Sequence, residues 1–223
     1  MKPSDDSGAA LILVLIVLLV MTAMAAALAL DSATDVAIAA NHRNATAGLY
    51  AADAVLMRAL PDIASAANLD DILAGTSRSA FVDGLPGGAR TLADDTQIDP
   101  AQAANRANCG KPAGCSPSEL TAITVARPWG ANNPVWQPYA YGPLPALAAG
   151  MHSPLYVVVL VADDPAENDG DPMHDGAGAG NPGTGLLAVR AVAFGPGRVQ
   201  QAVEVTIAAG DPVRIRSWRT AVP

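Results

Sequence analysis

The sequence predicts an α+β protein in which a long N-terminal helix packs on a C-terminal antiparallel β-sheet. Residues 9–30 form an uncharged apolar run, and residues 31–60 continue it with helical spacing and without proline. After residue 150, three valine-rich apolar segments are separated by turn signals. Because a period of three to four residues indicates a helix and β-branched segments between turns indicate strands, the two patterns divide the chain into these two parts.

The apolar run at residues 9–30 is long enough to cross a lipid bilayer. At about 1.5 Å per residue it spans about 33 Å, against about 30 Å for the hydrocarbon core. Thr22 is its only polar residue. The alternative is a secretory signal peptide cleaved at Ala27-Leu28-Ala29. We favour a retained membrane helix, because the run exceeds the usual apolar core of a signal and the helical pattern continues beyond Leu30.

Residues 31–60 extend the helix as an amphipathic segment. Alanine is abundant there, and Gly48 is the only glycine. Apolar residues recur at helical spacing, namely Leu49, Ala52, Leu56 and Leu60, while Asp53 and Arg58 lie off this stripe. One continuous helix over residues 9–60 would be about 78 Å long. Pro61 then predicts a break or a kink.

The remainder of the chain, residues 61–223, predicts a short helix followed by a sheet. The helix is expected over residues 62–73, closed by Gly75 as its C-cap. Strands are predicted at residues 120–126, 155–161, 186–194 and 199–208, with a tight turn at Gly195–Arg198 between the last two. The segment rich in proline and tryptophan at residues 128–139 predicts a loop that packs on the sheet.

Composition and motifs exclude several function classes. The net charge is −8, and lysine and arginine form no cluster of the kind that phosphate contacts need, so we expect no nucleic-acid partner. The densest basic group, Arg214, Arg216 and Arg219, is interpreted as a solvated strand edge. Ser79 beside Arg78 is interpreted as a polar surface pair. The sequence contains no nucleophile elbow, zinc-protease helix, phosphate-binding loop or dinucleotide fingerprint that follows a strand and opens a helix, so we expect no enzymatic activity.

Cys109 and Cys115 lie close together in a segment that contains glycine and proline. Two thiols do not complete a structural zinc site, which takes about four ligands, and the spacing is not that of a redox Cys-x-x-Cys motif. We therefore predict a disulfide that closes a loop, provided that this part of the chain lies in an oxidising compartment. The alternative is a pair of reduced, partly buried thiols.

Acidic residues cluster after the first of the later strands, at Asp163, Asp164, Asp169, Asp171 and Asp175. Calcium takes roughly six to eight oxygen ligands, so these carboxylates form a candidate calcium site. Asp169-Gly170-Asp171 has the alternate spacing of an EF-hand loop, but Met173 occupies the position of the next ligand, so the segment is no EF-hand. The competing interpretation, which we favour, is an acidic solvated loop without a metal.

Three short segments stand out in the N-terminal part. They are Gly8-Ala9-Ala10-Leu11 at the start of the apolar run, Asn41-His42-Arg43-Asn44, and Tyr50-Ala51-Ala52-Asp53-Ala54-Val55-Leu56. Together they resemble the N-terminal domain of PilX-type minor pilins, over about residues 8–60. The resemblance implies that prepilin peptidase cleaves between Gly8 and Ala9, that Ala9 is methylated, and that the helix assembles into a filament core.

The sequence departs from the pattern of major pilins at the fifth residue of the mature chain. Most major pilins carry glutamate there, and this sequence has Leu13. The glutamate neutralises the N-terminal ammonium of a neighbouring subunit inside an apolar core, where an unpaired charge is costly. A subunit without it suits the tip of a filament. The K-type minor pseudopilin of type II secretion and many PilX-like proteins share this feature.

The resemblance implies a prepilin leader at residues 1–8, a transmembrane helix at 9–30, an amphipathic continuation at 31–60 and a periplasmic α+β domain at 61–223. The expected function is that of a minor pilin-like structural subunit in the assembly, priming or tip of a type IV pilus, held in the inner membrane by a single pass. Its expected partners are other minor pilins, the major pilin, prepilin peptidase and the inner-membrane assembly platform. Two alternatives stay open: a minor pseudopilin of type II secretion, and a secreted or anchored calcium-binding adhesion module.

Overall fold

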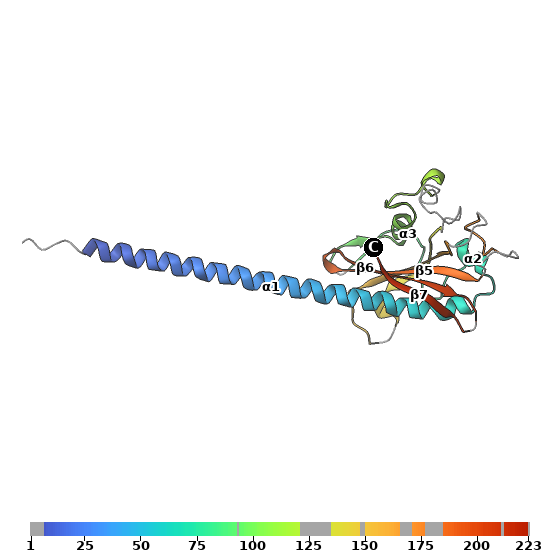
Figure 1. Cartoon of the computed structure of the whole chain (residues 1–223), viewed down its shortest axis with the longest axis horizontal. Coiled ribbons are helices and arrows are strands. Elements are labelled where there is room, and N and C mark those ends of the chain that lie inside the picture. Colours follow the sequence, from blue (N-terminus) through green and yellow to red (C-terminus); the bar gives the residue numbers. More distant parts are fainter. Residues whose placement is uncertain are drawn as a thin grey trace, which may run out of the picture. The chain divides into compact units, whose positions relative to one another are not determined.

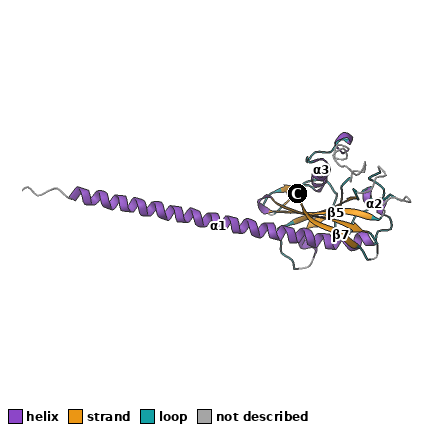
Figure 2. Ribbon diagram, viewed as in Figure 1, coloured by secondary structure: helices purple, strands orange, loops and turns teal. Residues whose placement is uncertain are grey.

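The computed structural model describes residues 7–92, 94–120, 135–147, 150–165, 171–176, 185–210 and 212–222. It divides into two units, Met1–Arg43 and Asn44–Pro223. The described part of the first unit is helix throughout. The second unit is an α+β domain that begins with the remainder of the same helix and ends with an antiparallel sheet, as Figures 1 and 2 show.

Helix α1 spans Ser7–Ala64, which confirms the prediction of one continuous N-terminal helix. The predicted break at Pro61 is wrong, because the helix continues for three more residues. The backbone N–H of Ser65 donates to the carbonyl oxygen of Pro61 at 3.0 Å, and Ile63 is buried in the core. Packing and hydrogen bonding therefore hold the turn beyond the proline.

The helix predicted at residues 62–73 is mostly wrong. Residues 62–64 belong to α1, and helix α2 spans only Leu69–Leu73. The side chain of Asn68 caps α2 by accepting a hydrogen bond from the backbone N–H of Asp70 at 3.2 Å, so the new helix begins there. Gly75 follows the C-cap with a φ of +70°, the left-handed conformation expected of a terminating glycine.

Five antiparallel strands form the main sheet in the order β3-β4-β5-β6-β7. Their bounds are Gln137–Pro143, Tyr156–Asp163, Leu186–Gly195, Val199–Ala208 and Arg214–Ala221. The predictions at residues 155–161, 186–194 and 199–208 correspond to β4, β5 and β6. The expected turn between the last two is the short 3-10 helix η2, Pro196–Arg198. No strand range was predicted for β3 or β7, although Arg214, Arg216 and Arg219 of β7 were expected at a strand edge.

The proline- and aromatic-rich segment is only in part a loop. Residues 137–139 lie in β3. Residues 121–134 lie outside the described residues, and this range includes all but the first residue of the strand predicted at 120–126. Trp136 and Tyr139 are both buried. The described aromatic side chains of this segment therefore pack on the domain, as expected.

The sheet is covered on both faces. On one face, the second half of α1 and helix α2 contribute to a core that includes Val157, Val159 and Val161 of β4. On the other face, helix α3 (Pro100–Cys109) covers residues of β4 such as Val158 and Leu160. Every residue of β4 is buried, which explains why its sequence is a continuous apolar run and does not alternate.

Three smaller elements complete the described part of the second unit. Strands β1 (Arg90–Thr91) and β2 (Gln97–Ile98) form a short antiparallel pair before α3. The 3-10 helix η1, Leu144–Leu147, follows β3 directly.

The two edges of the sheet differ. Along β3, residues 79–83 run beside the strand, and backbone hydrogen bonds join Ser79 to Tyr139 and Asp83 to Tyr141 at 3.1 and 2.9 Å. Strand β7 forms the opposite edge, and all its residues except Ala221 are exposed. The prediction of a solvated strand edge at Arg214, Arg216 and Arg219 is confirmed.

Candidate functional site

The apolar part of α1 is exposed along its whole length. Every residue from 8 to 39 is exposed, including all the leucine, isoleucine, valine and methionine side chains of residues 11–30. Over the described residues, α1 is also the one helix whose length and apolar composition suffice to cross a membrane. An apolar surface of this length needs lipid or other helices to cover it.

Hydroxyl groups do not interrupt this apolar surface. The hydroxyl of Thr22 donates to the carbonyl oxygen of Leu19 at 2.9 Å, and that of Thr34 donates to the carbonyl oxygen of Leu30 at 2.9 Å. Both donors are satisfied within the helix itself. The segment can therefore enter an apolar environment without leaving a side-chain donor unpaired.

The expected cleavage junction, Gly8 and Ala9, lies in the first turn of α1. A Cβ added at Gly8 would meet no atom within 4 Å, and the residue does not have the left-handed φ that favours glycine. Neither packing nor backbone conformation therefore requires glycine there. A requirement for Gly8 would have to come from an enzyme that reads this position.

The second half of α1 is built to pack. Ala51, Ala52, Val55, Leu56 and Ala59 are all buried against the sheet. The alanines among them let the helix approach the strands closely, and Leu56 and Val55 fill the core between them.

At Gly48, α1 lies close to β6. A Cβ at this position would lie 3.0 Å from the Cγ atom of Gln201. The amphipathic stripe predicted at Leu49, Ala52, Leu56 and Leu60 is the face that packs.

Asp62, near the end of α1, lies at the centre of a polar contact that the sequence did not reveal. Its carboxylate accepts hydrogen bonds from the Ser79 hydroxyl and from Arg58, the latter at 2.7 Å. Burial raises the pKa of Asp62, but the bonds from Ser79 and Arg58 outweigh it and leave the pKa below its usual value. Ser79 is buried, so its interpretation as a surface residue is wrong. The one feature of the sequence that indicated part of this contact was the four-residue spacing of Arg58 and Asp62, which places the two side chains next to each other on a helix.

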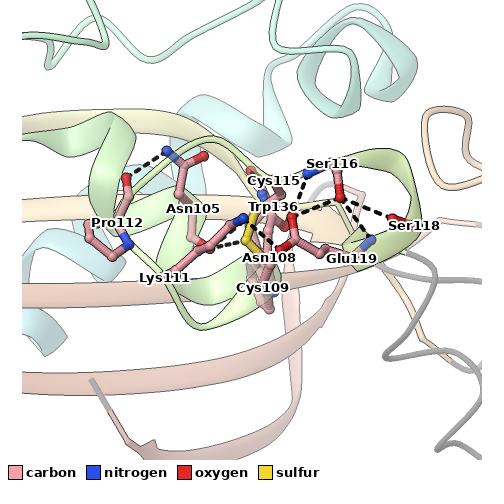
Figure 3. The surroundings of a disulfide bond; sticks show 10 residues. All are labelled: Asn105, Asn108, Cys109, Lys111, Pro112, Cys115, Ser116, Ser118, Glu119 and Trp136. Carbon is pink, nitrogen blue, oxygen red and sulfur yellow. Dashed lines mark hydrogen bonds and ion pairs between the residues drawn. A yellow bond between two sulfur atoms is a disulfide. The ribbon is translucent and has the colours of Figure 1, made fainter.

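Cys109 and Cys115 form a disulfide, as predicted (Figure 3). Cys109 is the last residue of α3, and Gly110 ends that helix with a φ of +76°. The carbonyl oxygen of Asn105 lies within 3.4 Å of both sulfur atoms. The disulfide closes the loop that leaves α3 and returns it toward the same helix.

Asn108 joins α3 to the start of β3. Its side-chain amide donates to the carbonyl oxygen of Trp136 at 3.1 Å and accepts from the Trp136 backbone N–H at 2.7 Å. Both bonds are buried, which makes them costly to lose.

Helix α3 has a start signal in the sequence that could have predicted it, namely Asp99 followed by Pro100. The Asp99 side chain caps the helix by accepting a hydrogen bond from the Ala101 backbone N–H at 2.9 Å.

Glu119 holds the far end of the loop that the Cys109–Cys115 disulfide closes. It accepts from the backbone N–H and the hydroxyl of Ser116, each at 2.8 Å, and from Lys111 at 2.6 Å. Ser116 and Glu119 have the spacing and the reciprocal bonds of a helix capping box. The hydrogen bond from Lys111, followed by those from Ser116, lowers the pKa of Glu119 to about 2.

The residues of the candidate calcium site are spread over different environments. Asp163 and Asp164 are only 0% and 7% exposed, so the interpretation of this segment as solvated is wrong for these two. Asp163 ends the buried strand β4, which accounts for its burial. Asp171 is exposed and contacts the ring of His174 at 2.9 Å.

Asp175 makes two hydrogen bonds to residues distant in the sequence, one through its backbone and one through its side chain. Its N–H donates to the carboxylate of Asp70 at 2.9 Å, and its own carboxylate accepts from the N–H of Gly185 at 2.7 Å. Asp169 lies outside the described residues. Among the residues that the structure does describe, no three acidic, histidine or cysteine side chains gather as a metal site. Calcium binding stays an untested prediction.

These features define a class: a helix-first α+β protein with the arrangement of pilins, in which a long N-terminal helix precedes an antiparallel sheet. Residues 7–56 match the family model of the PilX N-terminal domain, so this part of the chain is similar to the N-terminal domain of PilX-type pilins. PilX-type pilins are structural proteins of type IV pili. Searches of curated proteins and of solved structures found no significant match.

Proposed function

We propose that this protein is a minor pilin-like subunit that acts in the priming or at the tip of a type IV pilus. The apolar part of α1 anchors it in the inner membrane with the second unit in the periplasm. Prepilin peptidase cleaves between Gly8 and Ala9, and the assembly platform then transfers the helix from lipid to a filament. Its neighbours there are other minor pilins and the major pilin.

The observation that carries this proposal is the bare apolar surface of α1 within the matched family domain. Residues 8–39 are exposed, and residues 11–21 consist entirely of large apolar side chains. Lipid covers such a surface before assembly, and other helices cover it afterwards. Alanines at residues 23, 25, 26, 27 and 29 support the second step, because small side chains allow helices to approach closely.

The disulfide supports the proposed orientation. Disulfides persist in oxidising compartments such as the periplasm and are rare in the cytosol. The Cys109–Cys115 bond therefore favours placement of the second unit outside the cytoplasm.

Leu13 supports the tip position. A carboxylate at this place in a filament would neutralise the ammonium group of a neighbouring subunit, and leucine supplies none. An uncompensated ammonium group in an apolar core costs roughly several kcal/mol. This subunit is therefore poorly suited to positions in the shaft where its helix would meet the N-terminus of another subunit. The tip avoids that cost.

The first test identifies the N-terminus of the protein isolated from its native membrane. Processing at the proposed junction yields a chain that begins at Ala9. A chain that begins near Leu30 would instead indicate a secretory signal, and the filament proposal would be wrong. Substitution of Gly8 by alanine should block processing and leave the fold unchanged, because the added Cβ contacts nothing.

The second test places a charge in the apolar part of α1. Leu15→Asp should abolish recovery of the protein in sheared pili, because the carboxylate costs roughly 2.5–3.5 kcal/mol at the centre of a membrane helix. Ala37→Asp is the matched control, since Ala37 is also exposed on α1 but lies outside the apolar run. Equal recovery of both variants in the pilus fraction would contradict the mechanism.

A further inference from the structure

We propose that β7 binds, by strand pairing, an extended segment of another protein in which carboxylate and apolar side chains alternate. This contact goes beyond the proposed function, because it requires only the folded second unit and neither cleavage at Gly8 nor entry into a filament. It would give the subunit a partner-selective surface in addition to its helix.

The first observation is that β7 is the uncovered edge of the sheet. The opposite edge, β3, is bonded to residues 79–83 and contains two prolines, Pro138 and Pro143. Strand β7 is eight residues long and contains no proline, and no backbone hydrogen bond from outside the sheet reaches it within the described residues. An exposed strand edge offers a row of N–H and C=O groups to an added strand.

The second observation is that the two faces of β7 differ in chemistry. Directly paired residues of antiparallel strands share a face. Trp218 pairs with Val205 and Ile215 pairs with Ile207, so both lie on the face that α1 covers, yet they are 49% and 41% exposed. An added strand would therefore place apolar side chains beside Trp218 and Ile215.

Two of the three arginines of β7, Arg214 and Arg219, lie on the other face. Arg219 pairs with Glu204 and Arg214 pairs with Ala208, and neither Glu204 nor Ala208 belongs to the core under α1. Arg216 lies between Ile215, which pairs with Ile207, and Ser217, which pairs with Thr206, at the point where the register of β6 and β7 is irregular. Within the described part of the chain, Arg214 and Arg216 make no ion pair. Carboxylates on the added strand would supply partners for them.

This charge pattern selects between partners. Antiparallel pairing over the full length of β7 with β7 of a second copy would place Arg216 opposite Arg219, and like charges across a strand pair are destabilising. An acidic strand gains the opposite interaction. The partner is therefore a different chain with carboxylates at alternate positions, and not another copy of this protein.

The competing interpretation is that the arginines only protect the edge from aggregation. Charged side chains and very short strands are two ways in which proteins protect edges. Here the strand is eight residues long and exposes a tryptophan, which such protection does not explain.

The experiment uses the full chain in detergent micelles and a labelled, end-blocked peptide of alternating glutamate and valine, equal in length to β7. A second peptide has lysine in place of glutamate, and a third carries N-methyl groups on alternate amides. Fluorescence anisotropy measures binding, and hydrogen exchange locates it. We expect the glutamate peptide to bind, the other two to bind at least about tenfold more weakly, and β7 amides to gain protection on binding.

The double variant Arg214→Glu with Arg216→Glu tests the charge selection. It should prefer the lysine peptide over the glutamate peptide, and unchanged hydrogen exchange in β4 and β5 would show that it is folded. Four outcomes would overturn the proposal: no binding of the glutamate peptide, equal binding of the methylated peptide, protection elsewhere than β7, or an unchanged preference in the double variant. None of these outcomes bears on the N-terminus of the mature chain or on its recovery in pili.

Discussion

Leu56 provides a direct test of how α1 and the sheet are held together. It lies in the second half of α1, is 0% exposed and belongs to the core cluster that also contains Val157, Val159 and Val203. Truncation to alanine removes three buried carbon atoms and leaves a space that the surrounding strands fill only in part. Such changes cost about 2–5 kcal/mol, and we expect about 3 kcal/mol here.

The neighbouring residue gives a matched control. Met57 is 45% exposed on the same turn of α1, so Met57→Ala loses similar apolar volume without opening a cavity, and its cost should stay within about 0.5 kcal/mol. For a unit of this size, about 3 kcal/mol corresponds to a fall in Tm of about 6–12 °C. Thermal unfolding of the full chain in micelles, followed by tryptophan fluorescence, measures both variants.

The comparison of the two variants tests whether the second half of α1 is part of the core. Trp136 is 7% exposed in the second unit and should report its unfolding. If Leu56→Ala lowered Tm no more than Met57→Ala, the second half of α1 would not be part of the core, and the assignment of residues 44–64 to the second unit would be refuted.

Three further predictions concern the loop and the apolar run. Because its folded pKa of about 2 lies below the ordinary value of 4.5, Glu119 contributes stability that is present above pH 4.5 and is lost as the pH falls toward 2. Glu119→Gln should flatten that part of the pH–stability profile, measured by amide exchange in the loop around Lys111. Replacing both Cys109 and Cys115 by serine should cost about 2 kcal/mol in urea unfolding and remove any effect of reductant, whereas a wild-type protein insensitive to reductant would contradict a stabilising bond. Leu13→Glu should increase the number of copies recovered per pilus relative to Leu13→Gln, and equal numbers would argue against the tip assignment.

The parts of the fold that the sequence predicted are those with an uninterrupted signal. Residues 9–30 and 31–60 needed only length and periodicity, and β4, β5 and β6 needed only dense β-branched residues. Strand β3 contains Pro138, Gly142 and Pro143, and β7 contains three arginines, so neither matches the pattern of a central strand. Edge strands tolerate both features, because one side of the strand need not join the ladder. The bounds of the two edge strands therefore could not be predicted from residue type alone, although the arginines of β7 indicated a solvated strand edge.

The sites show the same division between local and long-range signals. The disulfide was predictable, because its cysteines are close in sequence and their number leaves few pairings. The contact between Asp62 and Ser79 joins residues 17 positions apart, and the bonds between Asn108 and Trp136 join residues 28 positions apart. Such contacts depend on how helices and strands pack. The burial of Asp163 also depends on the fold, because this last residue of β4 pairs with Leu187 of β5.

Two surfaces of this protein lack a partner within the described chain, and they differ in chemistry. In the first unit, α1 exposes a long apolar surface at residues 9–30, and the hydroxyl of Thr22 within it is satisfied by the helix itself, a combination suited to lipid and to other apolar helices. In the second unit, β7 exposes backbone groups, arginines and a tryptophan, a combination suited to an acidic extended segment. Neither ligand can satisfy both surfaces, because carboxylates are costly in an apolar helix interface and lipid tails accept no backbone hydrogen bonds. The two proposals together therefore assign this chain two kinds of neighbour, lipid or apolar helices at α1 and an acidic extended segment at β7.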